Sequence, residues 1–364
     1  MLPTRPLSTV RTGMLVLATT AACAKPVSET TPAPAPAVTV VTAPAVTAVA
    51  NPLLAEWTGP FGGIPPFDKV RVEHFKPALE AAMAENLAEI DRIANDPAAP
   101  TFENTLAALE RSGATLDRVT TVYGVFGSTM NDEAFQAVQR EMAPKLAAFS
   151  DRITQNSALF RRIESVYGAP DKAKLTPEQQ RLAWLYHTNF VRAGAKLDAG
   201  AKARLSQINQ ELAGLYTKFS QNVLADETNE FLVLESEADL AGLPQSVKDA
   251  AASAATAKKL PGKWVITNTR SAMDPFLTYS DRRDLREKAW RLFVNRGDNG
   301  GATDNNATIT RVLALRAERA KLLGYPTHAH WRLENAMAKT PERAVELMEA
   351  VWKPAVARVR EEVK

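Results

Sequence analysis

The sequence is poor in the residues that most often build reactive centres. Its 364 residues include one cysteine, Cys23, and four histidines. One cysteine excludes a disulfide within the chain. No histidine is followed by glutamate, so the zinc-binding pattern His-Glu-x-x-His is absent. The Gly-x-Ser-x-Gly turn that carries a nucleophilic serine is absent as well. These motifs therefore identify no catalytic residue, no cofactor-binding residue and no metal ligand in this chain.

A phosphate-binding loop and a strong excess of one charge are also missing. The glycines of "GDNGG" (297–301) are not followed by Gly-Lys-Ser or Gly-Lys-Thr, so this stretch is predicted to be a flexible connection. The chain has 44 basic and 41 acidic residues. Residues 1–50 hold three basic residues and one acidic residue, which gives +2 of the net charge of +3. Binding of nucleic acid needs clustered basic residues, and we predict no nucleic-acid partner.

No hydrophobic run reaches the ~20 residues that a membrane-spanning helix requires. The N-terminus instead reads "MLPTRPLSTVR", with two positive charges, and then "GMLVLATTAA", which is mostly apolar. Such a segment is typical of a secretory signal peptide, here residues 1–23. The two alanines before Cys23 resemble a bacterial lipobox, which predicts lipidation of Cys23 and a membrane contact through the lipid anchor only. Thr20 stands where that pattern prefers leucine, so ordinary signal cleavage stays open. Ala24 favours periplasmic sorting to the outer membrane.

Residues 24–50 have a restricted composition. They read "AKPVSETTPAPAPAVTVVTAPAVTAVA" and consist mainly of alanine, proline, threonine and valine. Proline opposes helix formation, and the segment has no large side chain to bury. We predict a disordered, extended tether that spans up to ~80 Å.

Residues 51–364 are predicted to be mainly α-helical. Apolar side chains recur at steps of three and four from Glu73 to Asn95 and again from Asp198 to about Asp226, which indicates two long helices. Thr101 is the expected N-cap of another helix. Further helices are expected at about 114–130, 132–154, 157–167, 177–193, 281–296, 303–323, 327–338 and 341–364.

One interval has the composition of a small β-sheet. "EFLVLES" (230–236) and "KWVITN" (263–268) are short and rich in β-branched and aromatic residues, and a helix after Pro244 separates them. The last helical pattern continues to Lys364 without a glycine or proline to end it. We therefore expect the helical region to be incomplete at its C-terminus.

The two closest histidines lie in "GYPTHAHWRL" (324–333). On a helix, His328 and His330 differ in direction by about 200°, so they do not share an ion. His330 and Glu334 share a face, which leaves a metal site at these three residues as a minor hypothesis. His74 and His187 are expected to pack or to form hydrogen bonds.

Four segments together resemble the thimet-oligopeptidase family of zinc metallopeptidases, in particular its bacterial peptidyl-dipeptidases (dipeptidyl carboxypeptidases). They are "WTGPFGGIPPFDKVRVEHFKPALEAAM" (57–83), "PTFENTLAALERSG" (100–113), "DRRDLREKAWRLFVNRG" (281–297) and "LLGYPTHAHWRLENAMAKTPE" (322–342). The resemblance covers residues 51–364, and none of the four segments is a catalytic signature.

The resemblance implies a two-lobed helical fold with a deep channel, of which this chain is the N-terminal part. It also implies oligopeptide substrates, release of C-terminal dipeptides, and zinc held by His-Glu-x-x-His and a later glutamate. No counterpart of those ligands exists in this sequence, so the zinc and the catalytic half are expected outside it. An alternative is a non-catalytic, peptide-binding lipoprotein derived from the same lobe. In both cases we expect residues 51–364 alone to be inactive.

Overall fold

The computed structural model describes residues 51–364, and these are mainly helical, as predicted. They form two compact units, residues 51–191 and residues 192–364, which are described separately. The predicted signal peptide, the tether and Cys23 lie outside the described residues. Within residues 51–364, no helix is both long enough and apolar enough to cross a membrane.

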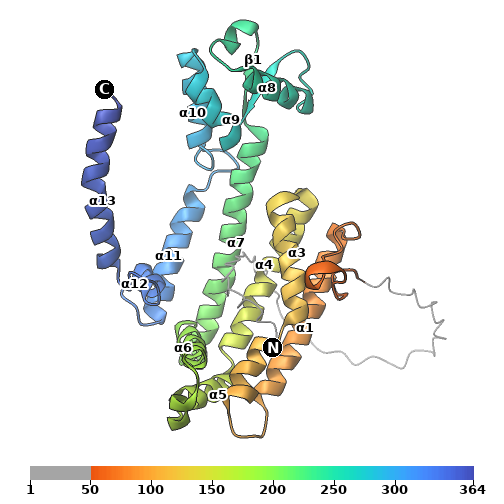
Figure 1. Ribbon diagram of the computed structural model, residues 1–364, viewed down its shortest axis with the longest axis vertical. Helices are drawn as coiled ribbons and strands as arrows, with labels where there is room; N and C mark the ends of the chain where they lie inside the picture. The colour runs from red at the N-terminus through yellow and green to blue at the C-terminus, as the bar shows by residue number, and fades with distance from the viewer. Residues whose placement is uncertain (1–50) are drawn as a thin grey trace, which may run out of the picture. The chain divides into compact units, whose positions relative to one another are not determined.

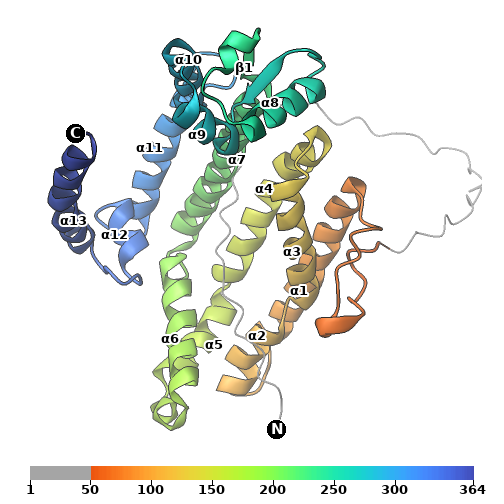
Figure 2. The ribbon, with the colours of Figure 1, turned by 45° about the horizontal axis from the view of Figure 1, so that its top comes forward.

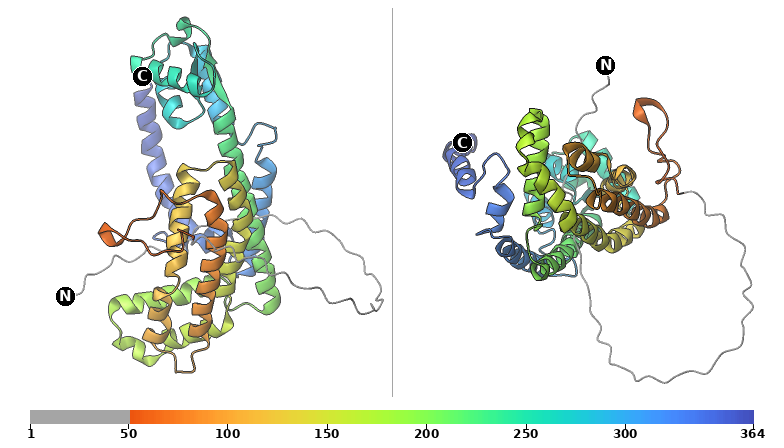
Figure 3. Two further views of the ribbon diagram at one scale, coloured as in Figure 1. Left: turned by 90° about the vertical axis from the view of Figure 1, so that its right-hand side faces the viewer. Right: turned by 90° about the horizontal axis from the view of Figure 1, so that it is seen from below.

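The first unit is built from antiparallel and crossing helices, of which α1, α3 and α4 lie side by side (Figures 1 and 3). Its longer helices are α1 (Phe75–Ala94), α3 (Ala114–Thr129), α4 (Glu133–Thr154), α5 (Ser157–Gly168) and α6 (Pro177–Arg192). Shorter turns of helix are η1 (Pro60–Gly62), η2 (Val72–His74), η3 (Phe102–Ala107), α2 (Ala108–Arg111) and η4 (Pro170–Lys174). These bounds agree with the predicted helices within a few residues.

The core of this unit is an aromatic cluster between α1, α3 and α4. Phe75 is fully buried, and its ring centroid lies 4.8 Å from that of Phe126 and 5.2 Å from that of Phe135. Both pairs meet edge to face, the arrangement that aromatic quadrupoles favour. Tyr123 joins the cluster, and burial raises the pKa of its hydroxyl above the ordinary value. The apolar stripe predicted for residues 73–95 is therefore the face that packs.

The predicted cap at Thr101 is confirmed. Its hydroxyl accepts a hydrogen bond from the amide of Asn104 at 3.1 Å, and the Asn104 side chain accepts one from the Thr101 amide at 2.7 Å. This reciprocal pair satisfies two amides that a helix start leaves without partners inside the helix.

The second unit consists of one long helix, a small sheet and several shorter helices (Figures 1 and 2). Its elements are α7 (Ala199–Asn229), β1 (Phe231–Leu234), η5 (Glu237–Leu240), α8 (Gln245–Ala257), β2 (Trp264–Thr267), α9 (Arg270–Tyr279), α10 (Arg283–Val294), α11 (Asn306–Leu322), α12 (His328–Leu333) and α13 (Pro341–Glu362).

The predicted small sheet is confirmed as an antiparallel pair, with Phe231 opposite Thr267 and Leu234 opposite Trp264. Helices α8, α9 and α10 pack against it around the buried side chains of Met273 and Phe276. Helix α9 was not predicted from the sequence. This helix has ten residues and contains Pro275, so its apolar pattern is short and carries a residue that usually opposes helix.

Helix α12 is shorter than the predicted helix at 327–338. It ends at Leu333, and Lys339 then adopts a left-handed conformation with φ of 64°. The next helix begins with the Thr340 hydroxyl as N-cap and Pro341 in its first turn. Because Thr340 and Pro341 begin a new helix, the preceding helix must end before residue 340. The predicted helix at 327–338 was therefore too long.

Candidate functional site

The histidine pair begins α12, but its two rings have different surroundings. His328 is partly buried against Trp331, with 5.4 Å between the ring centroids. Desolvation by burial, followed by the nearby charges of Arg319, Arg316 and Arg332, lowers the pKa of His328 to about 4. His328 is therefore a neutral packing residue at physiological pH.

His330 and Glu334 do not pair with each other. The Nδ1 atom of His330 lies 2.8 Å from the Thr327 hydroxyl, and its Nε2 atom lies 3.7 Å from a Glu342 carboxylate oxygen. Glu334 instead accepts hydrogen bonds from Arg192 and from the Tyr325 hydroxyl, each at 2.6 Å. Nowhere in residues 51–364 do three His, Cys, Asp or Glu side chains gather in a way that could hold a metal ion. The structure therefore does not support a metal site at His328, His330 and Glu334.

The other two histidines have the packing and hydrogen-bonding roles predicted for them. The Nδ1 atom of His74 accepts a hydrogen bond from the Arg71 amide at 3.0 Å, at the start of α1. His187 stacks on Tyr167, with 4.3 Å between ring centroids and an angle of 11° between the rings. Both histidines therefore stabilise the local structure around them.

Trp331 joins α12 to other parts of the second unit. The guanidinium of Arg319 lies 4.4 Å from the centre of its ring, and that of Arg192 lies 5.5 Å away. The indole N–H also donates a hydrogen bond to the Arg192 carbonyl at 3.1 Å. Cation–π contacts of buried arginines stabilise such an arrangement, so "HAHWRL" supplies scaffold in this unit.

The candidate functional site is a cavity of about 690 Å³ at the C-terminal end of α7. One wall comes from α7 and β1, another from α10, and a third from the loop that follows α10. Its polar lining includes Asp226, Glu230, Asn268, Lys288, Arg291 and Asn299. Cavities of this size accommodate small ligands or short segments of a larger one.

Buried Asp226 organises the loop wall. One of its carboxylate oxygens accepts hydrogen bonds from the Gly297 amide at 2.7 Å and from the Asn299 side chain at 2.9 Å. The other oxygen accepts one from the Thr303 hydroxyl at 2.5 Å. Charge-assisted hydrogen bonds of this kind are stronger than neutral ones. The prediction that "GDNGG" is a flexible connection is therefore wrong, because the loop is tied to the end of α7.

Gly297 is required at its place in this loop. It has φ of 71°, and a Cβ atom there would lie 2.8 Å from the Asn305 side chain. Asn305 is almost fully buried and donates a hydrogen bond to the Phe219 carbonyl of α7 at 3.1 Å. Only glycine provides both the left-handed conformation and the close approach.

Asn268 places a polar group with an unused hydrogen-bonding capacity in the lining. Its side chain is fully buried, and its amide nitrogen donates to the Leu292 carbonyl at 3.1 Å. Its oxygen Oδ1 accepts no hydrogen bond from any residue between 51 and 364. A buried acceptor without a partner costs about 1–3 kcal/mol, so this oxygen is a candidate for binding a donor from a ligand.

Two exposed cations on α10 complete the site. Lys288 and Arg291 are three residues apart, which places them on the same side of the helix. Arg291 binds Glu287 through Nε and Nη2, at 3.0 and 2.7 Å. The site thus combines cations with a buried acceptor. Sequence reasoning missed it because the residues come from five separate segments, and only the acidic end of α7 with the asparagine-rich loop gave a signal.

Comparison with known proteins defines the family of this chain. The profile described as Peptidase family M3 matches residues 276–364, from α9 to α13. A dipeptidyl carboxypeptidase of Salmonella typhimurium is 37% identical over 298 residues, which is 82% of this chain and 44% of that protein. The dipeptidyl carboxypeptidase of Escherichia coli is 36% identical, with the same coverage. A probable cytosolic oligopeptidase A of Arabidopsis thaliana is 30% identical over 82% of this chain and 43% of its own length.

The chain belongs to peptidase family M3, and the predicted resemblance to oligopeptidases is confirmed. It spans 44% of the length of the dipeptidyl carboxypeptidases that it matches.

Proposed function

We propose that this chain is the N-terminal part of a metallopeptidase that hydrolyses oligopeptides and releases dipeptides from their C-termini. The observation that carries the proposal is the 37% identity to a dipeptidyl carboxypeptidase across 82% of the chain. The similarity to oligopeptidases A supports the same class of substrate. Nucleic acid is not among the proposed partners, because basic and acidic residues are nearly balanced.

The zinc of such an enzyme does not fit the residues of this chain. Between residues 51 and 364 no three potential ligands form a cluster, and the predicted His328, His330 and Glu334 have other partners. We propose that the metal and the residues that perform hydrolysis belong to a C-terminal catalytic half. The described units then supply helical walls and binding surface.

Helix α13 supports the proposal of a catalytic half. All of its 22 residues are described, and none is buried. Its large apolar side chains are about half exposed or more, and most of them recur along one side. Those on this side are Val345, Met348, Val351, Trp352 and Val359, and Leu347 is exposed on another side. Because α13 lies within the region that matches the family profile, we propose that the catalytic half covers this face.

Exposure of this face affects the isolated chain. Each Å² of apolar surface left in water costs ~25 cal/mol, and a domain is stable by only ~5–15 kcal/mol. We expect residues 51–364 alone to associate through α13 and to show no peptidase activity.

The proposed location is the periplasm, with a lipid anchor to the outer membrane at Cys23. The charged and apolar leader and the two alanines before Cys23 support this proposal. A radiolabelled fatty acid fed to cells should label the chain, and Cys23→Ser should abolish the label and release the protein from the membrane fraction. A membrane-bound Cys23→Ser variant would contradict it.

The reading frame at the native locus tests the proposed activity. We expect the sequence past codon 364 to encode His-Glu-x-x-His followed by a further glutamate. The product of the whole frame should release dipeptides from the free C-terminus of a peptide, and a chelator should stop it. A frame without the zinc motif would refute the enzyme and favour the peptide-binding lipoprotein.

A further inference from the structure

The cavity at the end of α7 is built like a binding site and is not explained by the proposed chemistry. It has a rigid wall, because Asp226 holds Gly297, Asn299 and Thr303 in place. It also contains the buried oxygen of Asn268, for which residues 51–364 supply no donor. A wall that is already ordered loses little conformational entropy when a ligand binds, so this cavity suits a ligand of complementary shape.

The charges of the lining limit the class of ligand. Lys288 attracts an anion, and Arg291 does so less strongly because its guanidinium already binds Glu287, whereas Glu230 and Asp226 oppose a large negative charge. Glu287, which binds Arg291, brings the carboxylates to three against two cations, so phosphate groups and nucleotides are disfavoured relative to a single carboxylate. Oδ1 of Asn268 can in addition accept a hydrogen bond from an N–H or O–H donor of a ligand. A peptide provides both, since a carboxylate lies within a few bonds of a main-chain N–H.

We propose that this cavity binds a carboxylate-bearing peptide, with the carboxylate against Lys288 and Arg291 and a main-chain N–H donating to Oδ1 of Asn268. The inference rests on the proposed oligopeptide substrates and adds a binding site for them outside the catalytic half. The cavity of about 690 Å³ holds a few peptide residues. Binding here retains a peptide on the enzyme without taking part in its hydrolysis.

The test compares matched peptides on the whole 364-residue chain. The chain is kept in a mild non-ionic detergent, which covers the exposed face of α13. Three N-acetylated hexapeptides of neutral residues are titrated by calorimetry: one with a free C-terminus, one amidated, and one amidated with a single internal glutamate. We expect the free acid to bind at least fivefold more tightly than the neutral amide, and salt to reduce the difference.

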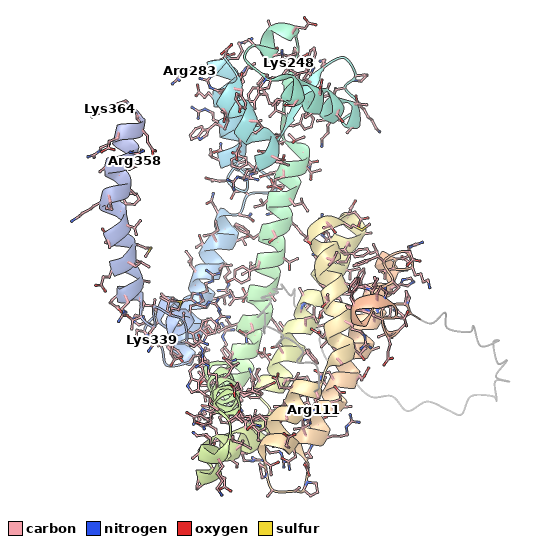
Figure 4. The ribbon with its side chains drawn as sticks, viewed as in Figure 1. Arg111, Lys248, Arg283, Lys339, Arg358 and Lys364 are labelled. Atoms are coloured by element: carbon pink, nitrogen blue, oxygen red, sulfur yellow. The ribbon has the colours of Figure 1, made fainter. Side chains whose placement is uncertain are left out.

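Two variants assign the preference to the cavity. Lys288→Ala with Arg291→Ala should remove the difference between acid and amide, because both cations are exposed and tolerate substitution. Arg283→Ala is the control for removing one charge, to be compared with Lys288→Ala alone, since this exposed arginine begins the same helix outside the cavity, as labelled in Figure 4. Asn268→Leu should weaken all three peptides alike. Equal affinity of acid and amide, or equal losses in the control, would overturn the proposal.

The third peptide identifies the source of the carboxylate. If the internal glutamate restores tight binding, the cavity recognises acidic side chains; if it does not, the cavity recognises the end of the peptide. Both results support the site. The outcome is independent of the zinc motif, because binding is measured without hydrolysis. A frame without the motif refutes the enzyme alone, and a chain that ignores the carboxylate refutes this site alone.

Discussion

Helices α1 and α13 have the same kind of sequence and opposite surroundings. Both have about six turns, with apolar residues at helical spacing. Helix α1 buries eight residues, among them Phe75 and Leu79, which are not exposed at all. Every residue of α13 is described and none is buried, and Trp352 is 65% exposed. An apolar stripe therefore shows that a helix has a face to cover, and does not show what covers it.

The buried face of α1 and the exposed face of α13 also contribute to different properties: the first to the stability of its unit, the second to association. A side chain that packs in α1 contributes to the free energy of unfolding of its own unit. A side chain on the face of α13 has nothing to lose on unfolding, and its apolar surface is available to another molecule or to another part of the enzyme.

The largest expected effect is at the centre of the aromatic cluster. Phe75→Ala should lower the free energy of unfolding by about 3–5 kcal/mol, because it removes a buried ring and leaves a cavity. Trp352→Ala on α13 should change it by less than about 0.5 kcal/mol. Urea unfolding followed by circular dichroism measures both, at a protein concentration at which the chain is monomeric. Similar losses in the two variants would mean that α13 is covered in solution.

The next largest effect is at Asp226. Asp226→Asn keeps the size of the side chain but removes the charge that accepts three hydrogen bonds. We expect a loss of about 1–3 kcal/mol and faster hydrogen exchange at the amide of Gly297. Asp298→Asn is the control, since that exposed carboxylate has one hydrogen bond, from Asn306. An unchanged exchange rate in Asp226→Asn would show that the loop is held by other contacts.

His328 should make stability depend on pH. Burial and the neighbouring arginines hold its pKa at about 4 in the folded chain, below its usual value near 6.5 in the unfolded chain. Between these values the unfolded chain binds more protons, so the contribution of His328 is full above pH 6.5 and is lost as pH falls towards 4. His328→Phe should remove this dependence. Its thermal midpoint should therefore exceed that of the parent by more at pH 5 than at pH 7.5. His330→Gln should keep the dependence, and a His328→Phe profile parallel to the parent's would contradict us.

The smallest effect on stability is expected from charges placed on the face of α13. Met348→Lys with Trp352→Lys should leave the thermal midpoint nearly unchanged and reduce association, as measured by light scattering after size-exclusion chromatography. Glu346→Lys changes the net charge by the same +2 but lies on the polar side of the helix. If Glu346→Lys reduces association equally, net charge and not the apolar face controls it.

Local signals in the sequence predicted most elements of the fold. Helical spacing located α1, α7 and α11, and β-branched residues located the two strands. Sequence-based prediction failed where tertiary contacts override the local preference of the residues. Pro275 masked α9, which the buried side chains of Met273 and Phe276 hold against the sheet. In the same way, the glycines of 297–301 indicated freedom, whereas a carboxylate 71 residues earlier in the chain fixes the loop.

Local sequence patterns were sufficient to predict the helical class, the small sheet, the roles of His74 and His187, and the family of the chain. These depend on the periodicity of apolar residues and on the order of short segments that resemble the family, and both can be read from neighbouring residues. The contacts of His330 and Glu334, the order of the 297–305 loop and the cavity beside it became visible only in the folded chain. Each of these depends on side chains that meet across long stretches of chain, where burial and charge, and not spacing, set the outcome.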